Sequence, residues 1–212
     1  METIERMLNG YRAFREKMPD DHQERLHAMV EAGQHPKAAV IACSDSRVDP
    51  ALVFRAEPGD IFMIRNVANL VPPMEEEGTF HGTSASLEFA VIGLDVPNII
   101  VLGHAHCGGI HAMIRGEEAE QKEYKFVQGW VSILSSAHRR VLATMPDATI
   151  EETQRACERN AVLVSLENLT TFPWIRERMA AKTLKLHGWF FDIETAQLEI
   201  YNSKVGHFET VE

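Results

Sequence analysis

Apolar residues recur at helical spacing in two successive stretches near the start of the chain. The first stretch places them three or four positions apart, at Ile4, Met7, Leu8, Tyr11, Phe14 and Met18. The second follows a pair of aspartates and ends at a glycine, with Asp20, Asp21, Leu26, Met29, Val30 and Gly33 as its markers. This spacing predicts two N-terminal helices within residues 1–33, each with an apolar stripe. The pattern leaves open whether these stripes pack on their own chain or on a second subunit.

Short, continuous apolar runs follow, at Ala38–Cys43, Ile61–Arg65 and Asn98–Gly103. Such runs are typical of strands that are covered on both faces. Between the second and third runs, residues 79–94 predict a helix with Leu87 and Val91 on one face. Because strand, helix and strand alternate, we expect a parallel sheet.

The second half of the chain predicts more helices and a closing strand pair. Apolar spacing predicts a helix over 124–142 and a long helix from Ile150, with Asp147 as its N-cap. Residues 183–191 and 198–202 predict two strands joined by a turn, whereas the residues after Asn202 predict nothing. The fold class is therefore α/β: a mostly parallel central sheet flanked by helices, with N-terminal helices and a C-terminal strand pair. No linker interrupts the pattern, so we expect one domain over residues 1–212.

Composition narrows the range of partners. Of the 212 residues, 45% are hydrophobic, which is enough for a full core. The formal net charge of −10 argues against a nucleic-acid or anionic-membrane surface, so a small molecule or another subunit is the expected partner. Apolar runs long enough to span a membrane do not occur.

Three cysteines, an odd number, do not make a disulfide framework. Glu2 and Glu5 interrupt the apolar residues at the N-terminus, which does not read as a signal peptide. We therefore expect a reducing, cytoplasmic location. Cys157 falls at helical spacing among apolar residues and is interpreted as an inert core thiol.

The other two cysteines and one histidine form a candidate zinc site. Cys43 ends one predicted strand, and His104 directly follows another, with Cys107 three residues later. In open parallel sheets, ligands gather beyond the carboxyl ends of the strands. Catalytic zinc commonly takes three protein ligands, among them Cys sulfur and His nitrogen, plus one water. We therefore expect one Zn²⁺ per chain on these three side chains.

Two charged residues follow the first ligand closely. Asp45 is placed to accept a proton of a zinc-bound hydroxide, and Arg47 can hold Asp45 away from the metal through a bidentate pair. After the last ligand, Gly108 and Gly109 are expected to allow a tight turn into a helix.

The segments Cys43-x-Asp45-x-Arg47 and His104-x-x-Cys107 resemble the signature of the β-class carbonic anhydrases. The resemblance extends over residues 30–200, where further segments look like those of the family: Arg65–Pro73, Gly82–Glu88, Gly103–Gly109 and His187–Trp189. It implies reversible hydration of CO₂ to bicarbonate and a proton, with zinc hydroxide attacking the carbon. It also implies Cys43, His104 and Cys107 as zinc ligands and Asp45 with Arg47 as the catalytic dyad.

The same resemblance suggests a substrate pocket and an assembly. In the plant-like subgroup a glutamine contacts substrate, and Gln34 stands at the matching position; the residues matching the apolar wall and the glycine beside the last ligand are Phe62, Val67, Phe89 and Gly108. The family is built on dimers or multiples of dimers, so a homo-oligomer is implied, with residues 1–33 available to pack on the partner subunit.

The family's allosteric subgroup binds bicarbonate through a tryptophan, an arginine and a tyrosine, but the matching positions here hold Val40, Arg65 and Phe191. Two of the three are missing, which implies the non-allosteric subgroup. Two alternatives stay open: a COS or CS₂ hydrolase on the same zinc site, and a non-catalytic zinc- or bicarbonate-sensing module.

Overall fold

The chain forms two compact units in the computed structural model, which describes residues 2–75, 81–115 and 124–212. The first unit, Met1–His35, contains α1 (Glu2–Glu16) and α2 (Asp20–Ala32), so both predicted N-terminal helices are confirmed. No residue of α1 is buried within the described chain. The apolar stripe of α1 is exposed, with Ile4, Met7, Leu8, Tyr11 and Phe14 as its members.

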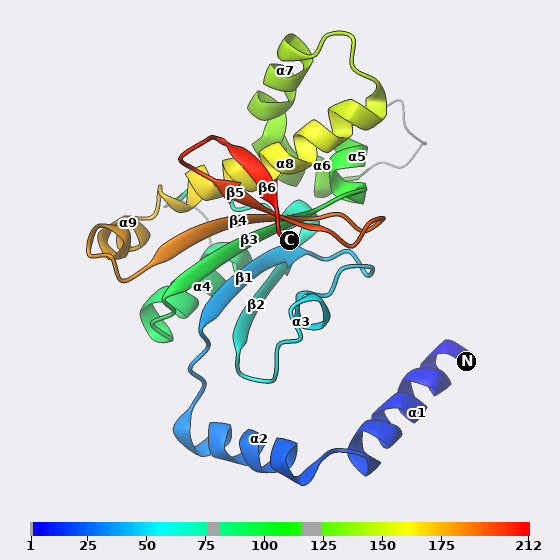
Figure 1. The fold of residues 1–212 in the computed structure, drawn as a ribbon, viewed down its shortest axis with the longest axis vertical. Coiled ribbons are helices and arrows are strands. Elements are labelled where there is room, and N and C mark those ends of the chain that lie inside the picture. The colour runs from blue at the N-terminus through cyan, green and yellow to red at the C-terminus, as the bar shows by residue number, and fades with distance from the viewer. Residues whose placement is uncertain (1, 76–80, 116–123) are drawn as a thin grey trace. The chain divides into compact units, whose positions relative to one another are not determined.

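The second unit, Pro36–Glu212, is built on a six-stranded sheet in the order β2-β1-β3-β4-β5-β6 (Figure 1). The strands are β1 (Ala38–Cys43), β2 (Ile61–Asn66), β3 (Asn98–His104), β4 (Lys185–Phe191), β5 (Leu198–Asn202) and β6 (His207–Thr210). The first four strands pair in parallel, and β5 and β6 add in antiparallel fashion. The predicted α/β class is confirmed.

Both faces of the parallel strands are covered, which explains their unbroken apolar runs. On one face, Ile41 and Val101 pack in a cluster with residues of α4 (Gly82–Glu88), α8 (Ile150–Leu169) and α9 (Pro173–Ala180). On the other face, Val40 and Leu102 pack with the segment that follows β1 and contains the short α3 (Pro50–Val53).

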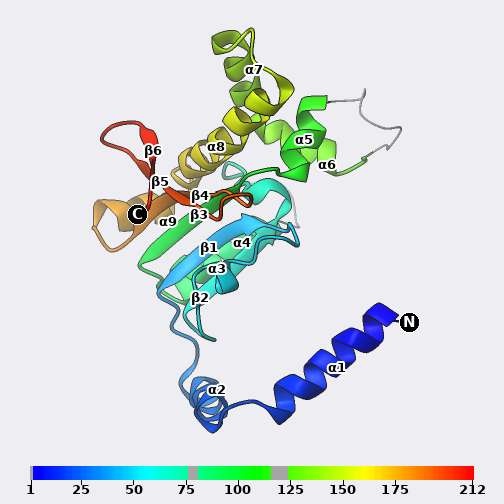
Figure 2. The same cartoon turned by 45° about the vertical axis from the view of Figure 1, so that its right-hand side comes forward.

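Three helices gather beside α8 near the carboxyl ends of β1 and β3 (Figure 2). They are α5 (Gly108–Arg115), α6 (Val127–Val131) and α7 (Ser135–Thr144). Buried residues of α5, α7 and α8 form an apolar cluster that includes Cys43 and Cys107, and Trp130 of α6 packs against it. The packing of this cluster holds the candidate site in place. Among the described residues, no helix combines the length and the apolar character needed to cross a membrane.

Several element boundaries differ from the expectations. The predicted helix over 124–142 is divided into α6, a 3₁₀ turn at Ser132–Leu134, and α7. Residues 79–80 of the predicted helix 79–94 lie outside the described residues; beyond them α4 passes into a π-helical turn, Phe89–Gly93. The short helices α3 and α9 and the strand β6 were not predicted.

The N-cap of α8 is Thr149, so the assignment of Asp147 to this role was wrong. The Oγ1 of Thr149 accepts the backbone N–H of Glu152 at 3.2 Å, and the Glu152 carboxylate accepts the N–H of Thr149 at 2.8 Å. This reciprocal capping box satisfies two amides that would otherwise lack partners at the helix start. Asp147 lies two residues before the N-cap position, too far from the helix to do the same.

Candidate metal centre

The register of the sheet brings the three predicted ligands together. Cys43 ends β1, His104 ends the neighbouring parallel strand β3, and Cys107 follows three residues later. The Cys43 side chain points to the same face as Ala39 and Ile41, because side chains alternate along a strand. The three ligand atoms lie within 4.8 Å of one another, and the two Sγ atoms are 3.9 Å apart. All three side chains are buried.

His106 makes the turn that joins His104 to Cys107. Its φ of 58° lies in the left-handed region, which is uncommon for a residue other than glycine. Gly108 and Gly109 have no such φ, so their expected role in the turn was wrong. Gly109 is needed for a different reason, since a Cβ there would lie 2.6 Å from Cγ1 of Val67. A Cβ on Gly108 would meet nothing within 4 Å.

One ring nitrogen of His104 is prepared for a metal. Nδ1 donates a hydrogen bond to the carbonyl oxygen of Ala105 at 2.8 Å, so the lone pair of the neutral ring lies on Nε2. This Nε2 is buried and has no hydrogen-bond partner within the described parts of the chain. A buried polar atom without a partner is costly, and a metal ion at the two sulfurs would satisfy it.

The two thiols form an asymmetric pair. Sγ of Cys107 lies within hydrogen-bond distance of Cys43 Sγ, and the backbone N–H of Ala68 donates to Cys43 Sγ at 3.3 Å. The hydrogen bond from Cys107 lowers the pKa of Cys43 well below its usual range, although burial opposes it, and the same interaction raises the pKa of Cys107. Two sulfurs and one imidazole nitrogen match the donors that zinc prefers, so the residues present fit this ion.

Asp45 and Arg47 form the expected ion pair beside the ligands. Arg47 donates from Nε to Oδ1 at 3.0 Å and from Nη2 to Oδ2 at 2.7 Å, and its backbone N–H also reaches Oδ1 at 2.9 Å. The side-chain hydrogen bond from Arg47 is the main reason why the pKa of Asp45 falls to about 2. Asp45 Oδ2 lies 3.9 Å from Nε2 of His104. An ionised carboxylate is therefore held next to the nitrogen that would bind the metal.

Comparisons with known proteins agree with this geometry. A family model described as carbonic anhydrase matches residues 38–198. This chain belongs to the carbonic anhydrase family. A carbonic anhydrase of Synechocystis is 33% identical over 97% of this chain and 73% of its own length. The mitochondrial beta carbonic anhydrase 6 of Arabidopsis thaliana is 36% identical over 92% of this chain and 67% of its own length. The solved β-carbonic anhydrase CcaA matches with a TM-score of 0.89 and 33% identity, covering 99% of this chain and 100% of that one.

The cofactor of this carbonic anhydrase is zinc, as its family and its donor set agree. Sequence reasoning named Arg65 of β2 only as a match to the allosteric trio and did not predict that it shapes the site. Its Nε donates to the carbonyl oxygen of Cys43 at 2.8 Å, and its Nη2 donates to those of Asp45 at 2.8 Å and Val48 at 2.6 Å. Arg65 thus fixes the loop that carries Asp45 and Arg47. The available signal in the sequence was a positively charged residue, Arg65, near the end of the strand that neighbours β1.

The predicted pocket residues of the carbonic anhydrase fall in different places. Val67, in the 3₁₀ turn Val67–Asn69, contacts the ligand region: its neighbour Ala68 donates to Cys43, and its carbonyl oxygen accepts Trp130 Nε1 at 2.7 Å. Gly108 begins α5 directly after Cys107. Val67 also lines a cavity of about 1010 Å³ between β2, α4 and α6.

Phe62 and Phe89 lie elsewhere in the chain. Their rings are 5.9 Å apart, but the register places Phe62 opposite Ala39, whereas Cys43 is opposite Asn66. Four residues along a strand correspond to about 13 Å. Gln34 is exposed and belongs to the N-terminal unit. The structure thus does not bring Phe62 and Phe89 to the metal ligands of the same chain, and the substrate roles of these residues stay predictions.

Proposed function

We propose that this chain catalyses the reversible hydration of CO₂ to bicarbonate and a proton, with Cys43, His104 and Cys107 holding the zinc ion. One observation carries the proposal: a buried set of three zinc-type donor atoms lies beside an ionised carboxylate that an arginine holds in place. Family membership supports the same reaction.

Asp45 is suited to orient the attacking group. When bound, zinc supplies a Lewis acid that lowers the pKa of water toward neutrality. Because the pKa of Asp45 is about 2, its carboxylate is an acceptor throughout the neutral range. Arg47 donates to both oxygens, from its backbone N–H and Nε to Oδ1 and from Nη2 to Oδ2, and Oδ2 also faces the ligand nitrogen of His104. Asp45 Oδ2 can therefore accept a hydrogen bond from a water beside the metal site, which would aim a lone pair of that water at CO₂.

The surroundings of the ligands suit an uncharged substrate. Cys43, His104 and Cys107 are enclosed by apolar residues that include Ala68, Leu70 and Ile110. CO₂ loses little hydration on entering such surroundings, whereas an ion would lose much more. Among the predicted pocket residues, Val67 packs against the apolar cluster around the ligands, and we assign it to the apolar wall beside the substrate.

We also propose that the enzyme belongs to the plant-like, non-allosteric subgroup. The bidentate pair between Arg47 and Asp45 supports an open fourth position on zinc. Arg65, the one retained residue of the allosteric trio, is engaged with three backbone carbonyls, and Val40 is fully buried. Bicarbonate titration of the activity tests this: hyperbolic behaviour is expected, and cooperative inhibition would contradict the assignment.

A homodimer or a multiple of dimers is the proposed assembly. The distance of Phe62 and Phe89 from the ligands of the same chain supports a pocket completed by a partner, and Phe89 is 52% exposed. A solved structure that matches with 27% identity is described as belonging to a pair of tetrameric β-carbonic anhydrases of Sordaria macrospora. Sedimentation measurements test the assembly.

The three free cysteines among the described residues support the further proposal of a reducing, cytoplasmic location.

The deciding experiment compares two substrates on one sample. CO₂ hydration is followed by stopped flow across pH on protein with quantified zinc, and COS hydrolysis is assayed in parallel. Fast hydration with one zinc per chain is expected. Zinc-loaded protein that cleaves COS but ignores CO₂ would move the assignment to the sulfur substrates, and inertness toward both would favour a sensing module.

A further inference from the structure

A carboxylate is buried on α8 directly behind the ligand turn. The side chain of Glu158 is only 1% exposed, although it carries a charge and lies against the backbone of the ligand Cys107. A buried charge is costly unless it is paired and hydrogen-bonded. The partners of Glu158 therefore indicate why a carboxylate stands at this position.

Glu158 has three partners, and one of them belongs to a metal ligand. Its Oε1 accepts the backbone N–H of Cys107 at 2.8 Å and Nε2 of Gln154 at 2.8 Å. Its Oε2 accepts Nη1 of Arg155 at 2.7 Å. The carboxylate thus joins the helix to the amide of Cys107 and is neutralised by an arginine one turn earlier.

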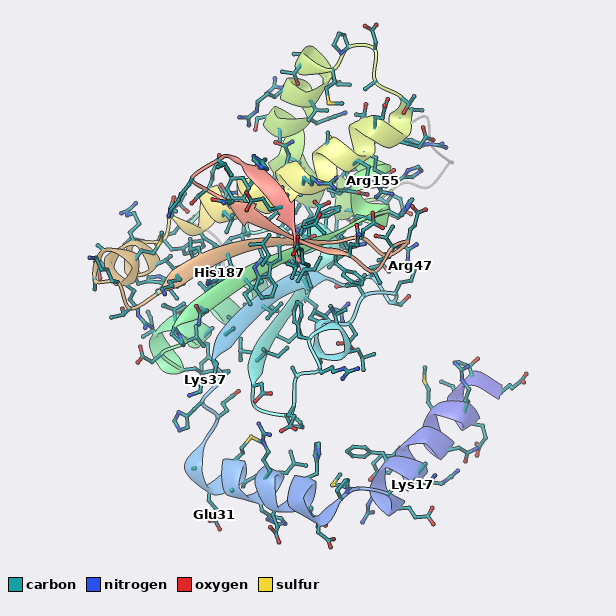
Figure 3. All side chains as sticks on the ribbon, viewed as in Figure 1. Lys17, Glu31, Lys37, Arg47, Arg155 and His187 are labelled. Carbon is teal, nitrogen blue, oxygen red and sulfur yellow. The ribbon has the colours of Figure 1, made fainter. Side chains whose placement is uncertain are left out.

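Arg155 extends this contact to the turn between the ligands. Its Nη2 contacts Nε2 of His106, and the same nitrogen lies 3.0 Å from Oε1 of Glu194. The carbonyl oxygen of the same His106 accepts Nη2 of Arg47 at 2.9 Å. Figure 3 shows Arg155 and Arg47 at the same end of the sheet, one on α8 and one after β1. The turn is therefore held from both sides.

We propose that Glu158 and Arg155 are positioning residues for the zinc site. Glu158 fixes the backbone of Cys107, and Arg155 fixes His106 in its left-handed conformation. Together they set how long zinc is retained and how Arg47 presents Asp45. The inference rests on the proposed function, since it needs Cys107 to be a zinc ligand.

Two physical arguments support this role. A left-handed φ at a residue other than glycine persists only where its surroundings enforce it, and His106 is held by Arg155 at its ring and by Arg47 at its carbonyl. The amide of Cys107 is buried, and without Glu158 it would lose its acceptor. Partners of this kind, one step behind the ligands, commonly change metal affinity or activity 10- to 100-fold when they are replaced.

The chain offers a matched control on the same helix. Arg159 forms a bidentate pair with Glu199 of β5, at 2.9 and 2.8 Å, and its guanidinium lies over the ring of Phe190. This pair is also partly buried, but it joins α8 to β5 rather than to the ligand turn. Glu199→Leu therefore removes another arginine–carboxylate ion pair of α8, one that does not contact the ligand turn.

The test measures zinc release and ligand geometry. Purified zinc protein is mixed with excess chromogenic chelator, and the cobalt-substituted protein gives the thiolate-to-cobalt absorption. Glu158→Leu is expected to release zinc about 10- to 100-fold faster than wild type and to shift the cobalt spectrum, with a lower kcat. Glu158→Gln keeps an oxygen that accepts the N–H of Cys107 but loses the charge that pairs with Arg155. Its rate of zinc release is therefore expected to lie between those of wild type and Glu158→Leu. Glu199→Leu is expected to match wild type.

Wild-type release rates and an unchanged cobalt spectrum in folded Glu158→Leu would overturn the inference. Equal acceleration in Glu199→Leu would do so as well, because the effect would then reflect helix stability alone. Where Glu158→Leu does not fold, Glu158→Gln decides, and wild-type behaviour in that variant refutes the role. Zinc-loaded wild type that fails to hydrate CO₂ would refute the proposed function, while the ranking of release rates still tests the positioning role.

Discussion

Replacing Arg47 with methionine tests how much the orientation of the Asp45 carboxylate contributes to the rate of the reaction. Arg47→Met keeps an unbranched apolar stem and the backbone N–H bond to Oδ1, but it removes the bonds from Nε and Nη2 to the carboxylate. It also frees the carbonyl oxygen of His106. The three ligands themselves are left in place, and comparing proteins of equal zinc content separates the defect in the reaction from any loss of zinc through the freed turn.

The magnitude follows from the two lost hydrogen bonds. A hydrogen bond to a charged group contributes about 1.5–3 kcal/mol. Because the Arg47 side chain is 53% exposed, solvent screens the pair and the lower end of that range applies. Two bonds then amount to about 3 kcal/mol, which corresponds to a fall of about 100-fold in kcat/KM.

Stopped-flow hydration on zinc-matched wild type and Arg47→Met checks this. The pKa of Asp45 should rise from about 2 toward its ordinary 3.8, which still leaves the carboxylate ionised at neutral pH. Raising the pH should therefore not restore the lost rate. A variant with full zinc and kcat/KM within about threefold of wild type, a difference below 1 kcal/mol, would refute the assignment of an orienting role to the pair.

Three further predictions concern stability. Gly109→Ala should destabilise the fold by about 1–3 kcal/mol in denaturant unfolding, since its Cβ would lie 2.6 Å from Val67 Cγ1, while Gly108→Ala should change little; equal effects would contradict the close approach. Thr149→Ala should cost about 1 kcal/mol through loss of the cap on α8, and Asp147→Ala should be neutral; the reverse order would restore Asp147 as the cap. The lowered pKa of Asp45 means that its pair stabilises the fold above pH 3.8 and that this contribution is lost as pH falls through about 2. Acid titration should thus destabilise wild type more than Asp45→Asn over this interval, and parallel curves would count against the pair.

Much of the site could be predicted from the sequence because parallel strands end at one edge of a sheet. Cys43 and His104 each end an apolar run, and that placement alone brings them together once the strands are neighbours. The i, i+2 spacing of Asp45 and Arg47 likewise predicts a local contact, which the structure contains. These inferences need only short-range spacing and strand order.

The long-range support of the site could not be predicted in the same way. Glu158 and Arg155 lie on a helix whose polar positions look like an ordinary solvated face, and their contact with Cys107 and His106 depends on how α8 packs. The carbonyl partners of Arg65 depend on the path of the loop after β1. Strand β6 was missed because its four residues are mostly exposed and carry no clear alternation, with Phe208 as the partly buried one.

The central claim is that a zinc ion on Cys43, His104 and Cys107 works with Asp45 to hydrate CO₂. The most direct measurement is the initial rate of CO₂ hydration near neutral pH, by stopped flow, for wild type and Asp45→Asn prepared with one zinc per chain. The account predicts rapid hydration by wild type and a strong loss in Asp45→Asn at equal zinc content. Absence of hydration by fully zinc-loaded wild type, or equal rates for the two proteins, would contradict it.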